Sequence, residues 1–284
     1  MVENNYKKMV ACMGTLVLFS FHPERKGSVP VDIPTGHHAV SHPAEQRYTL
    51  YLTFDDGPSP GSQIVNQLSQ KDSLQINVFL VGRNVFLNNK NRDLFRNYQG
   101  NPLIELGNHS YTHAGRHYKR YFKDPAGVVA DFNRNRDSLK LDNNFARLPG
   151  RNFFRMDTLS RDDISNGKEA ADMLANKGYE LFGWDLEWRR QPGKGIGVHT
   201  GAGMMDIVEK MLENKKTFLP GHLILLLHDH ELRDEDFRKE LEDFIQRAKA
   251  AGKFNFQHLS TYPSHHPSPS AIDSDSAAHL LNSE

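Results

Sequence analysis

Apolar positions along the chain follow two periods from residue 48 onward. Short, mostly apolar runs, typical of buried strands, alternate with stretches in which apolar residues recur every three or four positions, as on one helix face. The strand-like runs are Tyr48–Phe54, Ile76–Val81, Leu103–Leu106, Tyr179–Trp184, Leu223–Leu227 and Phe254–Leu259. The helical stretches include Ile64–Leu68, Val128–Phe132, Ala170–Ala175, Met204–Leu212 and Leu232–Ala250. This alternation predicts βα units around a mostly parallel sheet, an α/β fold.

Both ends of the chain differ from this pattern. Residues 23–46 are rich in Pro, Gly, Ser and His without sustained periodicity, which predicts a linker. Residues 263–284 are dominated by Pro, Ser, His, Asp and Ala and are expected to be a disordered tail. We therefore predict a single folded domain over residues 47–262.

The N-terminus has the pattern of an export signal. Lys7 and Lys8 precede a thirteen-residue apolar run, Met9–Phe21. That flank and length are typical of a signal peptide and too short for a comfortable membrane span. We expect residues 1–22 to be a signal peptide or N-terminal anchor of an exported protein. A buried N-terminal helix is the alternative.

Composition narrows the classes of partner. The 284 residues include 35 basic and 35 acidic side chains, and the sequence pI is about 7.3. This balance favours neither a nucleic acid nor an anionic membrane as partner. The only cysteine, Cys12, lies outside the predicted domain, so a disulfide or a cysteine metal site within that domain is excluded.

Two adjacent carboxylates, Asp55 and Asp56, directly follow the first predicted strand. Neighbouring like charges raise one another's pKa unless a cation compensates them, so the pair indicates a bound metal. For an isolated Asp-Asp-Gly-Pro sequence, an ordinary turn would be the simpler interpretation.

His109 and His113 favour the metal over the turn. If their segment is helical, the spacing of four residues places both rings on one side, where they can share an ion. Residues 110–112 contain no carboxylate, so a catalytic base must come from elsewhere in the chain. Asp55 and Asp56 fill that role together, one as a third ligand and one as the base.

Five motifs in order make the chain resemble the NodB-type polysaccharide deacetylases, carbohydrate esterase family 4. They lie between Tyr48 and Tyr262 and comprise Thr53–Pro58, His109–His113, Arg147–Arg151, Trp184–Trp188 and Leu226–His228. The resemblance implies one catalytic domain with a distorted, incomplete (β/α) barrel. It also implies a metal-dependent hydrolase that removes N-acetyl groups from N-acetylhexosamine units of a glycan.

The resemblance assigns roles to individual residues. Asp55 would be the catalytic base, Arg147 would hold that base, and His228 would be the general acid. A divalent metal, with Zn²⁺ as the first candidate, would be bound by three residues: Asp56, His109 and His113.

Two positions depart from the family pattern. Gly150 stands where the family usually has tyrosine, although its backbone N–H can still stabilise an oxyanion. Glu187 precedes Trp188 where the family usually has aspartate. The acid that supports His228 could therefore be Glu187 or Asp185.

Both tryptophans of the chain lie in the fourth motif. The apolar faces of Trp184 and Trp188 suit the C–H face of a sugar ring, although each could instead pack in the core. Leu226 is expected to form a wall for the acetyl methyl group. His117 is expected at the surface, and His230 is the substitute if His228 is misassigned.

The sequence leaves several functions open. The glycan could be peptidoglycan, a chitin-like oligomer or an exopolysaccharide, and a non-sugar amide is a further possibility. The chain could also be a non-catalytic, metal-containing glycan-binding protein, or its metal could be structural. The oligomeric state is not indicated.

Overall fold

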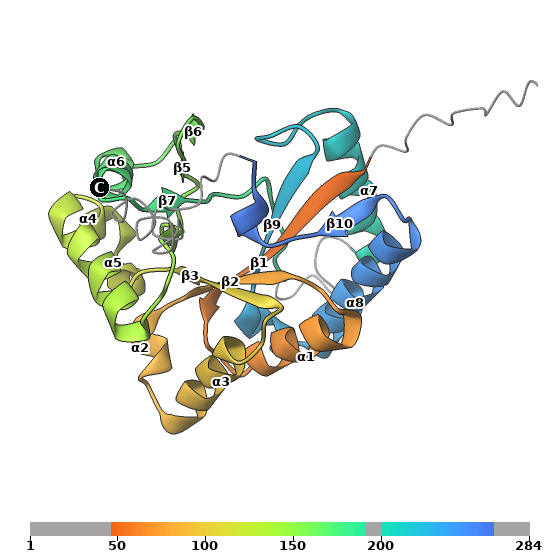
Figure 1. Cartoon of the computed structure of the whole chain (residues 1–284), viewed down its shortest axis with the longest axis horizontal. Coiled ribbons are helices and arrows are strands. Elements are labelled where there is room, and N and C mark those ends of the chain that lie inside the picture. The colour runs from red at the N-terminus through yellow and green to blue at the C-terminus, as the bar shows by residue number, and fades with distance from the viewer. Residues whose placement is uncertain (1–46, 191–199, 264–284) are drawn as a thin grey trace, which may run out of the picture. The chain divides into compact units, whose positions relative to one another are not determined.

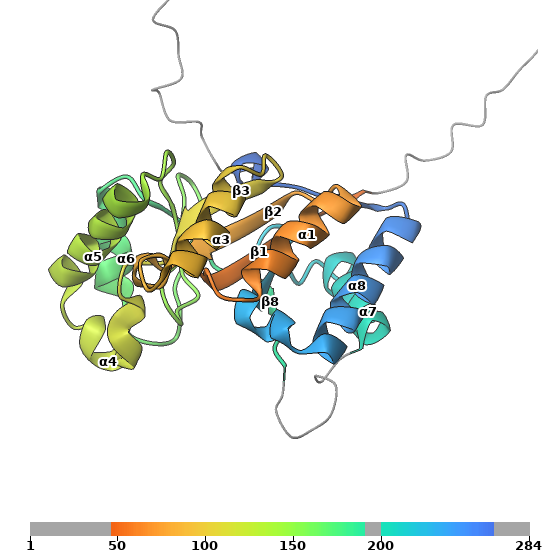
Figure 2. The ribbon, with the colours of Figure 1, turned by 90° about the horizontal axis from the view of Figure 1, so that it is seen from below.

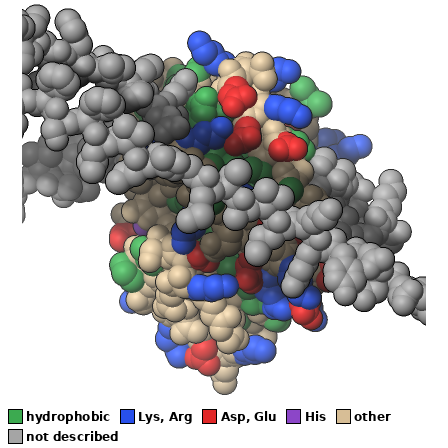
Figure 3. All heavy atoms as spheres, turned by 90° about the vertical axis from the view of Figure 1, so that its right-hand side faces the viewer, with side chains coloured by type: hydrophobic (Ala, Val, Ile, Leu, Met, Phe, Trp, Pro, Cys, Tyr) green, Lys and Arg blue, Asp and Glu red, His purple; other side chains and the backbone are tan. Residues whose placement is uncertain are grey.

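The computed structural model describes residues 47–190 and 200–263. The predicted signal peptide, linker and C-terminal tail lie outside the described residues, except Pro263 at the start of the tail. Within the described ranges, no helix has both the length and the apolar character needed to cross a membrane. Side chains of both charge signs are interspersed over the described part of the face shown in Figure 3, in keeping with the even balance of charge.

Ten strands in the described ranges join in one mixed sheet (Figure 1). The order is β6-β5-β7-β4-β3-β2-β1-β9-β8, with β10 also paired to β1. Pairing is parallel except where β5 meets β6 and β7. The strands are β1 (Tyr48–Gly57), β2 (Ile76–Leu80), β3 (Ile104–Asn108), β4 (Phe145–Ala146), β5 (Phe154–Arg155), β6 (Ser160–Arg161), β7 (Glu180–Leu181), β8 (Leu186–Glu187), β9 (His222–His228) and β10 (Phe254–Phe256). The predicted α/β class is confirmed.

Helices connect most of these strands. The α-helices are α1 (Ser62–Asp72), α2 (Gly82–Val85), α3 (Asn89–Gln99), α4 (Tyr118–Tyr121), α5 (Pro125–Leu139), α6 (Lys168–Asn176), α7 (Gly201–Glu213) and α8 (Glu235–Ala250). Three short 3₁₀ helices are η1 (His113–Arg116), η2 (Asp229–Arg233) and η3 (Leu259–Thr261). Figure 2 shows α1, α3, α7 and α8 on one side of β1 and β2.

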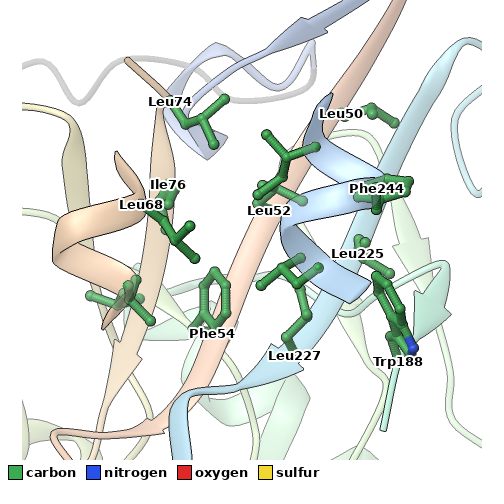
Figure 4. Packing of buried hydrophobic residues seen from close by; sticks show 14 of the residues in the cluster. Leu50, Leu52, Phe54, Leu68, Leu74, Ile76, Trp188, Leu225, Leu227 and Phe244 are labelled. Atoms are coloured by element: carbon green, nitrogen blue, oxygen red, sulfur yellow. The ribbon is translucent and has the colours of Figure 1, made fainter. Parts of the chain in front are cut away.

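The central strands are buried on both faces. On one face, Leu52 and Phe54 of β1 and Leu225 of β9 belong to a core that also contains Phe244 of α8 (Figure 4). The opposite face of β1 presents Tyr51 to a second apolar cluster. Burial on both faces explains the nearly continuous apolar runs in these two strands.

The sheet curls, so that distant strands share one interior. Phe154 of β5 packs against Phe218, just before β9, with ring centroids 4.2 Å apart. Tyr51 belongs to the same cluster. Among the described strands, however, β6 and β8 end the strand order without pairing to each other. The barrel is therefore distorted and incomplete, as expected.

Two predicted strands are shorter than expected. The run Phe254–Leu259 contributes only β10, which ends at Phe256. The run Tyr179–Trp184 contributes only β7, because the carbonyl groups of the residues that follow β7 accept hydrogen bonds from a side chain instead of from a neighbouring strand. The carbonyl oxygens of Phe182 and Gly183 both accept hydrogen bonds from Arg147. These carbonyls are thus committed to the guanidinium of a buried arginine.

Candidate active site

A cavity of about 280 Å³ lies at the carboxyl ends of the central strands. Asp55 pairs in register with His228 across β1 and β9, and Asn108 pairs with Ala146 across β3 and β4. Parallel strands end at the same edge, so the residues that follow them converge there. The cavity is lined by Asp55, Asp56, His109, His113, Tyr118, Gly150, Trp184, Glu187, Arg189, Leu226, His228, His230 and Glu231.

Asp56, His109 and His113 form the single cluster in the described ranges that could hold a metal ion. One potential ligand atom from each lies within 4.8 Å of the other two. Asp56 Oδ1 is 2.9 Å from His113 Nε2 and 3.5 Å from His109 Nε2. The predicted ligand set is therefore brought together at one point.

The backbone that brings the histidines together is not a helix, so the conditional helical explanation is wrong. His109 follows β3 directly, and left-handed backbone at Ser110 (φ 64°) and His113 (φ 52°) turns the chain. The turn is held by hydrogen bonds from Ser110 N to Asn108 Oδ1 and from His113 N to Ser110 Oγ. Non-glycine residues adopt such φ values only when their surroundings enforce them.

The orientation of His109 makes this cluster suitable for a cation. Its Nδ1 is 2.8 Å from the Arg147 carbonyl oxygen, which can only accept, so Nδ1 carries the proton. In the neutral ring, Nε2 then presents a lone pair toward Asp56 Oδ1. That carboxylate oxygen is buried and receives no well-directed hydrogen bond. Two nitrogens and one oxygen that converge without a shared proton fit a divalent metal such as Zn²⁺.

Asp55 is held by a buried arginine. Its Oδ1 accepts a 2.9 Å hydrogen bond from Arg147 Nη1, and both side chains are almost fully buried. The same guanidinium donates to Thr53 Oγ1, Phe182 O and Gly183 O. Asp55 Oδ2 remains on the cavity side, 3.6 Å from His109 Nε2.

His228 ends β9 and lines the same cavity as the two histidines of the cluster. Burial lowers the pKa of its imidazole, whereas the nearby carboxylates of Asp55 and Asp56 act in the opposite direction. The ring of His230 lies 5.6 Å away, between centroids, and also lines the cavity.

Asp185 does not support His228, which corrects one of the two predicted alternatives. Asp185 lies beside the beginning of β9, whereas His228 ends that strand. Its Oδ1 accepts from Phe218 N at 2.6 Å and its Oδ2 from Ile224 N at 2.8 Å. Its carboxylate thus satisfies the backbone where β9 begins. Glu187 lines the cavity, where it forms an ion pair with Arg189.

Sequence reasoning missed three residues of the cavity lining: Glu231, Tyr118 and Arg189. Glu231 Oε2 is 4.0 Å from His228 Nδ1. Among the described residues, this is the one carboxylate contact with that nitrogen. The spacing of three residues between His228 and Glu231 was the available signal. Tyr118 packs beside Gly150, whose φ is 61°.

The predicted sugar contacts divide into two groups. Trp184, Leu226 and Gly150 line the cavity. Trp188 does not: it is 1% exposed and packs edge to face against Phe237 and Phe244. Its prediction as a substrate contact is wrong, because β8 directs it toward the core beneath α8.

Two further histidines lie outside the cavity lining. His117 is exposed, as expected. His222 has a structural contact, a 3.0 Å hydrogen bond between its Nδ1 and Tyr51 OH.

Comparison with known proteins supports one family. Residues 36–152 match the family model for polysaccharide deacetylases. A chitin disaccharide deacetylase from Vibrio alginolyticus is 28% identical over a match that covers 49% of this chain and 47% of the relative. The chain thus matches about half the length of that curated relative.

Solved structures share the fold. A carbohydrate esterase family 4 enzyme from Streptococcus mutans has a TM-score of 0.55 at 22% identity, covering 74% of this chain and 86% of that one. A family 4 carbohydrate esterase from Streptomyces lividans, in complex with acetate, has a TM-score of 0.55 at 18% identity. That match covers 78% of this chain and 98% of the other.

Proposed function

We propose that the chain, which belongs to the NodB-type polysaccharide deacetylases of carbohydrate esterase family 4, removes N-acetyl groups from a glycan. The substrate class is N-acetylhexosamine units of a poly- or oligosaccharide. A curated relative acts on a chitin disaccharide, and one structural neighbour binds acetate, the product that such a reaction releases. The observation that carries the proposal is the convergence of Asp55, His228 and a three-residue metal cluster on one cavity.

The three side chains of the candidate metal site would hold the ion that acts as Lewis acid. A divalent cation held by Asp56, His109 and His113, with Zn²⁺ as the first candidate, would polarise the acetyl carbonyl and lower the pKa of water. The remaining chemistry belongs to the side chains around it.

Asp55 would act as the general base. Its Oδ2 faces the cavity, while Arg147 bonds its Oδ1 and holds the carboxylate in place. Through Oδ2, the carboxylate can take the proton of a water that attacks the acetyl carbon. The backbone N–H of Gly150 would stabilise the negative charge that develops on the carbonyl oxygen.

His228 would act as the general acid. It lines the same cavity as Asp56, His109 and His113, and its strand neighbour in register is Asp55. In its protonated form it would donate a proton to the amine nitrogen as the C–N bond breaks, which converts a poor leaving group into a neutral amine. Base and acid thus act on the same bond from two adjacent strands.

Trp184 and Leu226 would bind the sugar. The face of Trp184 suits the C–H surface of a hexose ring. Leu226 would contact the acetyl methyl group. We infer that residues 47–262 form the catalytic domain, and that residues 1–22 direct its export to a compartment where glycans of this kind occur.

The activity is tested by acetate release from N-acetylglucosamine oligomers. Protein stripped with a chelator and then restored with zinc should release acetate only after restoration. An Asp55→Asn variant with zinc bound serves as the control and should be inactive. Equal release with and without metal would contradict the mechanism. Zinc-dependent glycan binding without acetate release would instead indicate a binding protein.

A further inference from the structure

Two carboxylates in the cavity wall, Glu187 and Glu231, have no role in the mechanism above. Glu231 lies in η2, three residues after His228, and its side chain is 10% exposed. Its Oε1 accepts a hydrogen bond from Arg190 N at 3.2 Å. Its Oε2 is buried and accepts no hydrogen bond from the described residues, although it lies 4.0 Å from His228 Nδ1.

A buried carboxylate oxygen without a donor is costly, because it has lost water and gained no partner. The nearby Nδ1 of His228, when protonated, can donate the hydrogen bond that Glu231 Oε2 lacks. An imidazole acts through one nitrogen in a fixed direction only when the other nitrogen is held by a hydrogen bond. The separation exceeds hydrogen-bond length by about 1 Å, which a small rotation of the Glu231 side chain closes. Catalytic hydrogen bonds are often long before substrate binds.

The two acids that the sequence offers as supports for His228 are already engaged. Asp185 accepts two backbone hydrogen bonds at the beginning of β9. Glu187 pairs with Arg189, and its side chain is 26% exposed, more than that of Glu231. Of these three acids, Glu231 is therefore the one that can accept a hydrogen bond from His228 Nδ1.

We propose that Glu231 is the positioning residue for His228, accepting the Nδ1–H of the imidazole so that Nε2 faces the substrate nitrogen. The inference rests on the proposed function, in which His228 is the general acid. Ionised Glu231 also stabilises the protonated imidazole electrostatically. The pair is formed within one strand end and the helical turn that follows it.

Other charges act on both groups. Burial raises the pKa of Glu231 to about 7; Arg189 opposes this shift, whereas Glu187 and Asp56 reinforce it. His228 is faced by Asp55, Asp56, Glu187 and Arg189, and by the ring of His230. A test must therefore observe His228 itself as well as the rate.

The direct test is the tautomer of His228 in the zinc-restored protein. Nitrogen-15 NMR of the histidine rings, with His228 assigned by a His228→Gln variant, should show the neutral ring protonated at Nδ1. A neutral ring protonated at Nε2 would overturn the proposal. This measurement needs no Glu231 variant to fold and no active enzyme, so it is separate from the test of deacetylation.

Variants test the functional consequence. Glu231→Gln should lower the pKa of His228 by about one pH unit and reduce kcat about 10- to 100-fold, with KM little changed. Glu231→Asp should recover part of the rate. The matched control is Glu235→Gln, an exposed acid in the first turn of α8, which should behave as the wild type.

Three results with these variants would refute the role of Glu231. In the first, Glu231→Gln changes neither the titration of His228 nor kcat. In the second, Glu187→Gln shifts His228 while Glu231→Gln does not, which assigns the supporting acid to Glu187. The third is equal loss of rate in the glutamine and aspartate variants, with the wild-type titration of His228 preserved in both, which would indicate a purely structural role.

Discussion

Replacing Arg147 by lysine is expected to destabilise the fold while conserving the positive charge. The guanidinium is fully buried and donates to four oxygens: Asp55 Oδ1, Thr53 Oγ1, Phe182 O and Gly183 O. A lysine ammonium is a single point with three donors and cannot span that arrangement. It would retain the ion pair with Asp55 and lose the two carbonyls that lie beyond β7.

The magnitude follows from those two carbonyls. Leaving a buried acceptor without a partner costs about 1 to 3 kcal/mol, so two such acceptors cost about 2 to 6 kcal/mol, with about 4 kcal/mol as the central value. For a domain of this size, each kcal/mol lowers the melting temperature by about 2 to 4 °C. Arg147→Lys should therefore lower it by about 8 to 16 °C.

The assay is thermal unfolding followed by circular dichroism, with the metal content of each sample matched. Arg96→Lys is the control, because Arg96 is exposed and pairs only with Asp93 among the described residues. That variant should melt within about 1 °C of the wild type, as surface substitutions usually do. The reasoning is refuted if Arg147→Lys also melts within about 2 °C of the wild type, because the positive charge alone would then be enough to maintain the stability of the fold.

Three further predictions concern other parts of the site and its support. Asp56→Asn should reduce the zinc bound per protein, measured by elemental analysis, whereas Asp55→Asn should retain zinc and lose turnover; equal zinc loss would contradict the division of roles. Trp188→Ala should cost about 3 to 5 kcal/mol of unfolding free energy in denaturant titrations, whereas Trp184→Ala should mainly raise KM; the reverse pattern would contradict the burial assignment. Burial raises the pKa of Asp229 from 3.8 to about 6, so between these two pH values the folded state binds a proton that the unfolded state has lost. Protonation of Asp229 therefore stabilises the folded state at low pH, and this contribution to the free energy of unfolding falls by about 3 kcal/mol as the pH rises from about 4 to 6. Asp229→Asn should flatten that part of the stability curve, and an unchanged slope would refute the shift.

Much of the fold followed from periodicity. The runs that became β1, β2 and β9 are buried on both faces, so their apolar pattern was continuous and easy to recognise. The helix α3 was missed because only Asn91, Leu94 and Tyr98 of its eleven residues are buried, which leaves a weak apolar face. Short strands such as β5 and β6 were missed because they depend on long-range pairing that local sequence does not encode.

The sequence predicted most residues of the candidate site, but not the backbone geometry that brings them together. The motif residues Asp55, His109 and His228 meet because parallel strands end at one edge. The left-handed turn between the histidines was not apparent, since residue types alone do not specify a positive φ at serine or histidine. The burial of Trp188 depends on α8, which is distant in sequence. The three missed residues, Tyr118, Arg189 and Glu231, lie outside the five motifs.

Zinc-dependent acetate release is the most direct test of the central claim. We expect chelator-treated protein to release no acetate from N-acetylglucosamine oligomers, zinc-restored protein to release it catalytically, and zinc-loaded Asp55→Asn to release none. Release by zinc-loaded Asp55→Asn at the wild-type rate, or release that is independent of metal, would contradict the account.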